Sequence, residues 1–229
     1  MSTSYLFVVK DAKGNVANDA VTVQVYGADL NVCTWEPLDF TDIDGETYPS
    51  AWHVVANAQN PPYCESITQW KNSGPSILLS DVVFDQGFLT GQFTVQDPFD
   101  DDLIGFVFGY QSDQDFFLFQ WKRANQAWGD QISHAGMNVK RLKSKTPLLG
   151  MDFFTSYAYP PNASVLYGPY GPVEPAGDWT AQDFQDHWGW TGFITYQWTL
   201  HVTGDQATIS VYDVDNETLF HTFEFTLPD

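Results

Sequence analysis

The sequence predicts an all-β domain, because short runs with strand-like alternation recur along the chain and no long run has the helical period. The clearest case is 87–95, in which apolar or glycine residues alternate with Thr90, Gln92 and Thr94. At 229 residues the chain is long enough for one large all-β domain, or for a domain with a fragment of another, and its aromatic residues (17%) are scattered among short runs. No helix is expected apart from a single turn at 180–187.

Two aromatic-rich runs, 103–110 and 116–122, are separated by the polar loop 111–115 and predict a β-hairpin. Alternation in the first run predicts one bulky face and one glycine-rich face, against which another segment must pack closely. The bulky face consists of Phe106, Phe108 and Tyr110. The second run is apolar on both faces, which is typical of a central strand buried on two sides.

Further strands are predicted at alternating or apolar runs that are bounded by turn residues. In chain order they are 5–10, 20–26, 52–55, 66–70, 139–143, 196–202, 207–211 and 219–225. The last hairpin turns at Gly204-Asp205. His201 is expected on the polar face of its strand, and a surface or edge position is expected for each of the five dispersed histidines.

The net charge of −20 makes nucleic acid a poor partner, because an acidic field repels phosphates. Aspartate supplies most of the acid and suits both turns and oxygen-ligand cation sites. Solubility in a salty medium explains the bulk of the charge equally well. No apolar run reaches 18 residues, so no membrane span is expected, and the N-terminus shows no signal peptide.

The motifs of common enzyme classes are missing from the sequence. There is no GxSxG, no HExxH and no glycine-rich phosphate loop. A glycosidase needs two carboxylates across a cleft, but the ExDxxE strand pattern is absent. The chain is therefore predicted not to be an enzyme, with glycoside hydrolase kept as a minor alternative.

The hairpin carries a family resemblance. Asp-Asp-Asp-x-x-Gly-Phe-Val-Phe-Gly-Tyr-Gln from residue 100, followed by Phe-x-x-x-x-Trp-Lys ending at residue 122, resembles the C-terminal lectin-like domain of the thrombospondins. A looser likeness extends over 70–212 and includes 136–140 and 189–200. The resemblance implies a calcium-binding jelly-roll β-sandwich of the concanavalin A-like (L-type lectin-like) kind. It also implies a secreted or cell-surface location and adhesion rather than catalysis.

The ends of the chain suggest a larger multidomain protein. The strands within 1–27 resemble the last two strands of an immunoglobulin-like or PKD-type repeat, and 28–229 then forms the thrombospondin-like sandwich. Alternatively, the N-terminal strands pair with the main sheet. The family continues with a further pair of strands beyond the position of Asp229, so either the sandwich is truncated or the N-terminal strands fill that place.

The carboxylates at the hairpin are the candidate metal ligands, because hard cations take six to eight oxygen atoms. Asp100, Asp101 and Asp102 precede the first strand, and two of the three are expected to bind Ca2+, since neighbours on an extended chain point in opposite directions. Help is expected from nearby loops, with Asp97, Asp113 and Asp115 as candidates. The alternative is a solvated acidic turn.

The two cysteines, Cys33 and Cys64, have no CxxC spacing and so predict no metal knuckle. If the chain is extracellular they are expected to form a disulfide, and two buried free thiols are the alternative.

Two further surfaces are candidates for partner binding. The long segment 146–187 is rich in aromatic residues and is expected to form an ordered flap, where Tyr170, Trp179 and Trp188 are candidates for stacking on sugars. Packing of these rings onto the sheet is the alternative, and the one favoured. A cationic run, made of Lys140, Arg141, Lys143 and Lys145, fits an edge strand protected by lysine better than a docking strip for an acidic partner.

Together these observations predict a non-catalytic, calcium-binding extracellular adhesion or matrix-interaction module. The main alternative is a carbohydrate-binding lectin-like module. The expected partner is an extracellular protein or a glycan.

Overall fold

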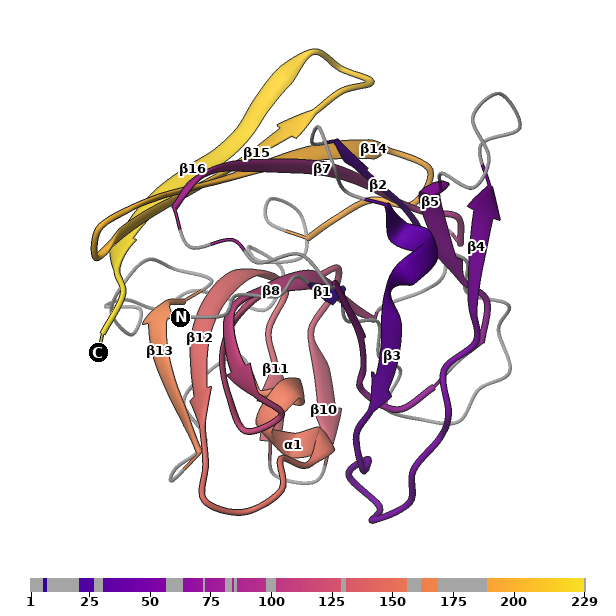
Figure 1. Ribbon diagram of the computed structural model, residues 1–229, viewed down its shortest axis with the longest axis vertical. Coiled ribbons are helices and arrows are strands. Elements are labelled where there is room, and N and C mark those ends of the chain that lie inside the picture. The colour runs from indigo at the N-terminus through magenta and orange to yellow at the C-terminus, as the bar shows by residue number, and fades with distance from the viewer. Residues whose placement is uncertain are drawn as a thin grey trace.

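The computed structural model describes residues 6–7, 21–26, 31–56, 64–71, 73–80, 84, 86–97, 102–128, 131–155, 162–168 and 189–228, and the statements below refer to these residues. They form a sandwich of two antiparallel sheets, one of seven and one of five strands. In Figure 1 the seven-stranded sheet arches over the five-stranded sheet. The predicted all-β sandwich is therefore confirmed.

The seven-stranded sheet has the order β16-β15-β14-β7-β2-β5-β4. Its strands, listed in that order, are β16 (Thr218–Thr226), β15 (Gln206–Asp213), β14 (Thr195–Thr203), β7 (Gly87–Val95), β2 (Val21–Tyr26), β5 (Cys64–Gln69) and β4 (Trp52–Ala56). The strand predicted at 87–95 is β7, with the same bounds in the structure.

The five-stranded sheet has the order β1-β8-β9-β12-β13. Its strands are β1 (Leu6–Phe7), β8 (Leu103–Ser112), β9 (Asp115–Lys122), β12 (Gly136–Lys143) and β13 (Ala163–Tyr167). Strands β8 and β9 are the predicted hairpin, and β9 lies at the centre with seven of its eight residues buried. The prediction of a central strand buried on both faces is confirmed.

Shorter elements lie outside the two main sheets. They are η1 (Val32–Thr34), β3 (Glu36–Asp39), which pairs with β6 (Ser76–Leu79), β10 (Gln126–Trp128), which pairs with β11 (Gln131–Ser133), and helix α1 (Gly150–Phe154). In Figure 1, α1 and the β10–β11 pair lie on the side of the five-stranded sheet that faces away from the seven-stranded sheet. The expectation of no helix outside 180–187 was wrong for α1; five residues are too few for a helical period to stand out in a sequence.

Two hydrophobic cores follow from the alternation of β9. One face of the strand points between the sheets and joins the main core, whose largest members include Phe93, Phe106, Phe119, Trp121 and Trp198. The opposite face joins a smaller core beneath α1 and β6, which contains Phe40, Ile77, Phe116, Leu118 and Phe153. Because both faces are covered, β9 has no solvent-facing side.

The close approach predicted at the glycine face of β8 is present. A Cβ atom added at Gly105 would overlap the carbonyl oxygen of Phe119 and lie 2.9 Å from the Cα of Gln120. The neighbouring strand β9 therefore takes the space that a side chain at Gly105 would need.

Tyr110 corrects the predicted alternation of β8. A register irregularity between Phe108 and Ser112 coincides with a positive φ of 59° at Gly109. Beyond this bulge Tyr110 packs against Phe116 in the smaller core, with 5.9 Å between ring centroids, whereas Phe106 and Phe108 belong to the main core. A bulge of one residue exchanges the two faces of a strand, which simple alternation does not predict.

The N-terminal strands pair with the main sheets. Strand β2 lies between β7 and β5, and β1 pairs with β8. This is the second of the two arrangements expected for these strands. The assignment of 1–27 to an upstream immunoglobulin-like or PKD-type module stays a prediction, and the pairing gives it no support.

The disulfide expected between Cys33 and Cys64 is confirmed, with 5.2 Å between the Cα atoms. It links η1 to the start of β5, at the side of the sandwich where Val32 and Trp35 enter the main core. The Asn31 side chain supports the same junction, since its Oδ1 accepts hydrogen bonds from the backbone amides of both cysteines.

The edges of the two sheets are joined by a side-chain contact between Tyr167 of β13 and His221 of β16. The Tyr167 hydroxyl oxygen lies 2.7 Å from Nε2 of His221. Burial lowers the pKa of His221 below its usual 6.5, because desolvation disfavours the charged ring. The unfolded chain therefore takes up a proton at this ring more readily than the folded chain does.

This linkage predicts a pH dependence of stability. Since the folded pKa of His221 lies below the unfolded one, its contribution is fully present above about pH 6.5 and is lost as the pH falls through the folded pKa. Thermal melts at pH 7.5, 6.5 and 5.5 should show a steeper fall for the native chain than for His221→Gln. The matched control is His201→Gln on the outer sheet face. Equal slopes in the native chain and His221→Gln would contradict the assignment.

Candidate functional site

The two ends of the β8–β9 hairpin lie far apart. The Asp triplet leads into β8 at one end, where Leu103 pairs with Lys122. Asp115 pairs with Ser112 at the other end. A strand rises about 3.3 Å per residue, so the ten residues of β8 separate the two ends by roughly 30 Å.

At the triplet end the structure describes Asp102, whereas Asp100 and Asp101 lie outside the described residues. Asp102 is 1% exposed, and its backbone carbonyl accepts a hydrogen bond of 3.1 Å from Nε1 of Trp190. A Cβ atom at Gly189 would overlap the carbonyl oxygen of Arg123, so the 189–190 segment lies directly against the backbone that follows β9. The entry of β8 is thus a closely packed part of the fold.

Other carboxylates lie at this end of the sandwich. Asp97 follows β7, which leads towards β8, and Asp213 ends β15. Asp215 accepts a hydrogen bond from the backbone amide of Thr195 at the start of β14. Among the residues that the structure describes, no three metal-binding side chains form a cluster. The donor set of the triplet suits a hard cation such as Ca2+, and the described part of the chain shows one member of that set, Asp102.

Asp113 and Asp115 do not join the triplet, and the expectation that they help it is corrected. Both lie at the far end of the hairpin because β8 is a full strand between them and Asp102. Asp115 instead forms ion pairs of 3.2 Å with Nε of Arg141 and 3.6 Å with Nζ of Lys143. Asp113 is exposed at the hairpin turn.

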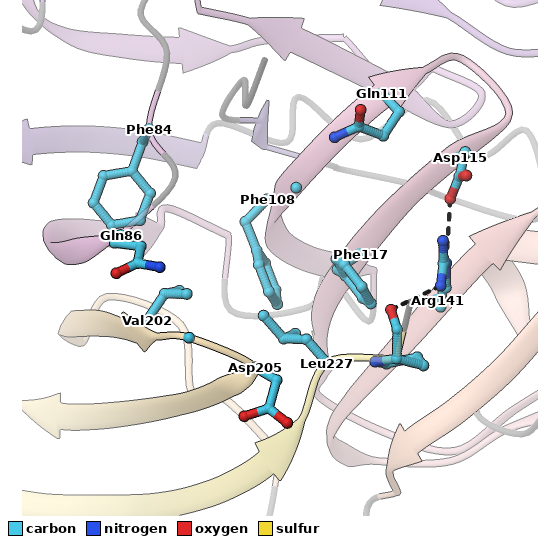
Figure 2. A pocket seen from close by; sticks show the side chains of 13 residues that line it. Phe84, Gln86, Phe108, Gln111, Asp115, Phe117, Arg141, Val202, Asp205 and Leu227 are labelled. Carbon is cyan, nitrogen blue, oxygen red and sulfur yellow. Dashed lines mark hydrogen bonds and ion pairs between the residues drawn. The ribbon is translucent and has the colours of Figure 1, made fainter. Parts of the chain in front are cut away.

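A pocket of about 690 Å3 opens at the far end of the hairpin (Figure 2). Its walls come from both sheets, as the ends of β8, β9 and β12 face the β14–β15 turn and the segments next to β7 and β16. The lining residues that matter most are Phe108, Phe117, Gln111, Arg141 and Asp205. The sequence analysis missed this pocket, since its members are scattered from Phe84 to Pro228.

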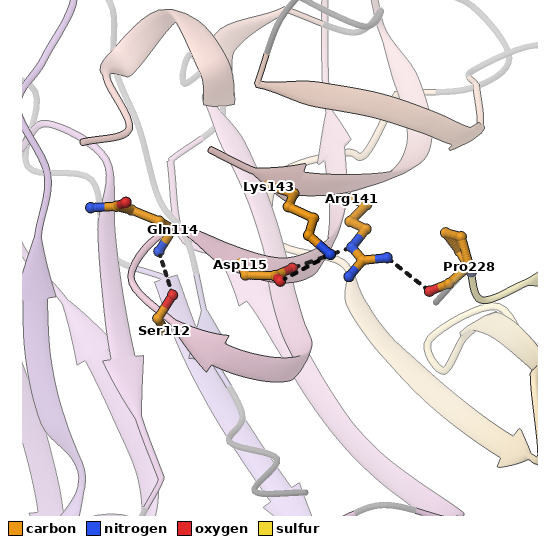
Figure 3. A network of polar contacts seen from close by, with 6 residues as sticks. All are labelled: Ser112, Gln114, Asp115, Arg141, Lys143 and Pro228. Atoms are coloured by element: carbon orange, nitrogen blue, oxygen red, sulfur yellow. Dashed lines mark hydrogen bonds and ion pairs between the residues drawn. The ribbon is translucent and has the colours of Figure 1, made fainter. Parts of the chain in front are cut away.

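Arg141 closes one wall of the pocket through contacts with β9 and with the segment that follows β16; Figure 3 shows its contacts with Asp115 and Pro228. Besides the ion pair with Asp115, its Nη1 donates a 2.9 Å hydrogen bond to the carbonyl oxygen of Pro228. Its guanidinium carbon lies 5.4 Å from the ring centroid of Phe117. The contact with Pro228 ties the five-stranded sheet to the segment that follows β16.

The comparisons with known proteins agree with the family resemblance of the hairpin. Residues 50–152 match the model of the thrombospondin C-terminal region. Thrombospondin-4 of Bos taurus is 33% identical over 85 residues, which is 35% of this chain and 9% of that protein. Thrombospondin-2 of Homo sapiens is 37% identical over 87 residues, 36% of this chain and 7% of that protein. The match therefore spans a small part of these relatives.

The thrombospondin-like segment, residues 50–152, begins before β4 and extends into α1. It contains the Asp triplet, the complete β8–β9 hairpin and β12, but not β14, β15 or β16. The hairpin end of the pocket therefore lies within it, as do Phe84 and Gln86, whereas the lining residues from Val202 to Pro228 lie outside it.

The cationic run of the thrombospondin-like segment does not lie on an edge strand. Strand β12 lies between β9 and β13, so the edge-strand interpretation was wrong. Lys140 is fully buried, and its Nζ donates hydrogen bonds to the carbonyl oxygens of Asp152, Phe153 and Thr155 at 2.7, 3.1 and 2.8 Å. It therefore anchors the C-terminal end of α1 to the sheet. Lys143 and Lys145 are exposed.

The aromatic candidates for sugar stacking, Tyr170, Trp179 and Trp188, lie outside the described residues. A different exposed ring occurs on the outer face of the seven-stranded sheet. Phe88 is 72% exposed and stacks on His201 with 3.9 Å between centroids. His201 is thus on the polar face of β14, as predicted. In the described part of the chain, no helix is long and apolar enough to cross a membrane.

Proposed function

We propose that this chain is a non-catalytic, calcium-binding module for extracellular adhesion or matrix interaction. The observation that carries the proposal is the match of 50–152 to the thrombospondin C-terminal region, because this segment contains the Asp triplet and the hairpin that carry the family resemblance. The disulfide between Cys33 and Cys64 fits an oxidising, extracellular compartment. The expected partner is an extracellular protein or a glycan.

The calcium ligands proposed are two of Asp100, Asp101 and Asp102, with Asp97 as a neighbouring candidate. Three successive carboxylates at the entry of a strand bring several oxygen atoms together, which is what Ca2+ requires. Asp102 supplies a buried carboxylate in a closely packed environment, and ligands fixed by packing need little further ordering when an ion binds. Asp113 and Asp115 are excluded from this ion because of their position at the far end of β8.

Calcium at 5 mM is expected to stabilise the folded chain by about 1–2 kcal/mol, if its affinity is that of extracellular modules, roughly 0.1–1 mM. For a chain of this length the melting temperature should rise by roughly 2–8 °C. Asp101→Asn with Asp102→Asn should abolish most of this rise. Differential scanning calorimetry with and without calcium measures it.

Two further variants keep the calcium test decisive. Asp100→Asn with Asp101→Asn leaves the buried Asp102 in place and serves if the first double variant does not fold. Asp113→Asn with Asp205→Asn removes the same charge from exposed positions at the opposite end and should keep the full response. An equal calcium response in the triplet variants and the native chain would overturn the assignment.

Sugar binding at Tyr170, Trp179 and Trp188 stays a second prediction for this module. Replacing Trp179 with alanine should abolish binding to any glycan that stacks at this place, with the melting temperature unchanged. If adhesion occurs through protein contacts alone, an array of glycans with calcium present should show no strong signal.

A further inference from the structure

The pocket at the end of the sandwich has the features of a ligand site that is separate from the calcium end. Its volume of about 690 Å3 lies within the range of small-molecule sites, roughly 300–1,000 Å3. It lies beside the hairpin turn, and the Asp triplet lies at the other end of β8. A ligand bound here would not compete with an ion at the triplet.

The pocket has an aromatic floor. The rings of Phe108 and Phe117 stack with 5.3 Å between centroids, and Phe84, Val202 and Leu227 continue the apolar surface on the opposite wall (Figure 2). A Cβ atom at Gly109 would lie 2.7 Å from Cδ2 of Phe117, so glycine at the bulge lets the ring lie against the backbone. These two rings are tightly packed, with Phe108 2% and Phe117 9% exposed, so the apolar surface that a ligand can reach comes from the partly buried Phe84 and Leu227.

Polar groups stand around this floor. Gln111 and Asp205 are exposed on opposite sides of the pocket, and Gln86 is exposed beside Phe84 (Figure 2). Amide side chains both donate and accept hydrogen bonds, and a carboxylate accepts them at two oxygen atoms. Asp115 and Arg141 neutralise each other on the remaining wall and fix its shape.

The chemistry of this lining selects among ligands. An anion would meet Asp205 in a chain whose net charge is −20, and the Arg141 side chain is already paired with Asp115. A wholly apolar ligand would remove the amide and carboxylate groups of the rim from water without replacing their hydrogen bonds. A neutral ligand with one apolar face and many hydroxyl groups matches both the apolar surface of Phe84 and Leu227 and the polar rim. Pyranose rings have this character, because their CH groups stack on aromatic rings while their hydroxyls form hydrogen bonds.

We propose that this pocket binds a neutral saccharide, with the apolar face of one sugar ring against Phe84 and Leu227 and its hydroxyls held by Gln111 and Asp205. The site differs from the aromatic candidates at 170–188 and goes beyond the proposed calcium-dependent adhesion. Its walls come from both sheets, so it exists only in the folded sandwich.

The test uses the whole chain on an array of neutral oligosaccharides built from glucose, mannose, galactose and xylose, with sulfated and sialylated glycans on the same array. Binding is expected to neutral glycans and not to the anionic ones. Isothermal titration with the neutral oligosaccharide that binds most tightly on the array then compares the native chain with one double variant, Gln111→Ala with Asp205→Ala. The double variant should bind roughly tenfold or more weakly, because hydrogen bonds to the sugar hydroxyls are lost.

Matched controls locate the site. Gln92→Ala with Glu224→Ala changes one amide and one carboxylate on the outer face of the seven-stranded sheet and should bind normally. Asp100→Asn with Asp101→Asn should also bind normally, which separates this result from the calcium assignment. The proposal is overturned if no neutral glycan binds at millimolar concentration, if only anionic glycans bind, or if the Gln111 and Asp205 variant keeps native affinity while folded.

Discussion

Replacing Lys140 with methionine is expected to lower the free energy of unfolding by about 3–5 kcal/mol, because a buried cation is removed from three backbone carbonyls that then have no donor. Methionine fills most of the lysine volume, so the loss reports the hydrogen bonds rather than a cavity. The melting temperature should fall by roughly 6–20 °C. Chemical unfolding followed by circular dichroism measures the difference.

The position of α1 depends on the same contacts. The helix has five residues, too few to be stable alone, and its N-terminal end is supported by Asp152, whose Oδ2 accepts a hydrogen bond from the Leu149 amide. Without Lys140, the C-terminal end of α1 should separate from the sheet and expose Phe153 to solvent. Hydrogen exchange at 150–155 should therefore become faster in Lys140→Met than in the native chain.

Lys143→Met is the matched control for Lys140→Met. It removes the same charge from the same strand, but the Lys143 side chain is 58% exposed and pairs with Asp115 at 3.6 Å. Exposed ion pairs contribute at most about 1 kcal/mol. If the free energy of unfolding falls by a similar amount in the two variants, the buried contacts of Lys140 with the backbone carbonyls do not stabilise the fold as proposed.

Replacing Trp121 with alanine is expected to cost about 3–5 kcal/mol, since this fully buried side chain joins the two sheets. It lies on β9, and its ring meets Tyr196 of β14 and Phe220 of β16 at centroid distances of 4.6 and 5.0 Å. The vacated space would be lined by large rings, which cannot collapse into it without moving a strand. Near-ultraviolet circular dichroism should lose intensity along with the stability.

Two comparisons test this role of Trp121. Trp121→Phe keeps an aromatic ring and should cost less than Trp121→Ala. Phe88→Ala removes an exposed ring from the outer face of β7 and should change stability by less than about 1 kcal/mol. A small effect of Trp121→Ala, close to that of Phe88→Ala, would show that the inter-sheet contact is not needed for the fold.

The hairpin shows how far local pattern predicts this fold. Apolar residues on both faces of 116–122 predicted a central strand, because a strand with no polar face has no side that can meet water. The structure buries seven of the eight residues of this strand. The predicted face of Tyr110 was wrong because the bulge at Gly109, where φ is positive, shifts the register within the strand.

The candidate site was predictable only in part. The Asp triplet stands out in the sequence because three identical charges at a strand entry are uncommon and chemically suggestive. The exclusion of Asp113 and Asp115 required the strand between them and Asp102 to be known in full. No pattern in the sequence predicts the pocket, because Phe108, Arg141 and Asp205 are far apart along the chain and come together only where the ends of several strands meet.

The sequence by itself determined most strands of the two main sheets and, outside the bulge at Gly109, which of their faces are apolar, since side chains alternate along a strand whatever its partners are. Only the tertiary structure decided what covers each face. Lys140 and Lys143 belong to one cationic run, yet α1 buries the first and water surrounds the second. Segments distant along the chain set the environment of a charge. They therefore decide whether a lysine holds another segment in place, as Lys140 does, or faces water, as Lys143 does.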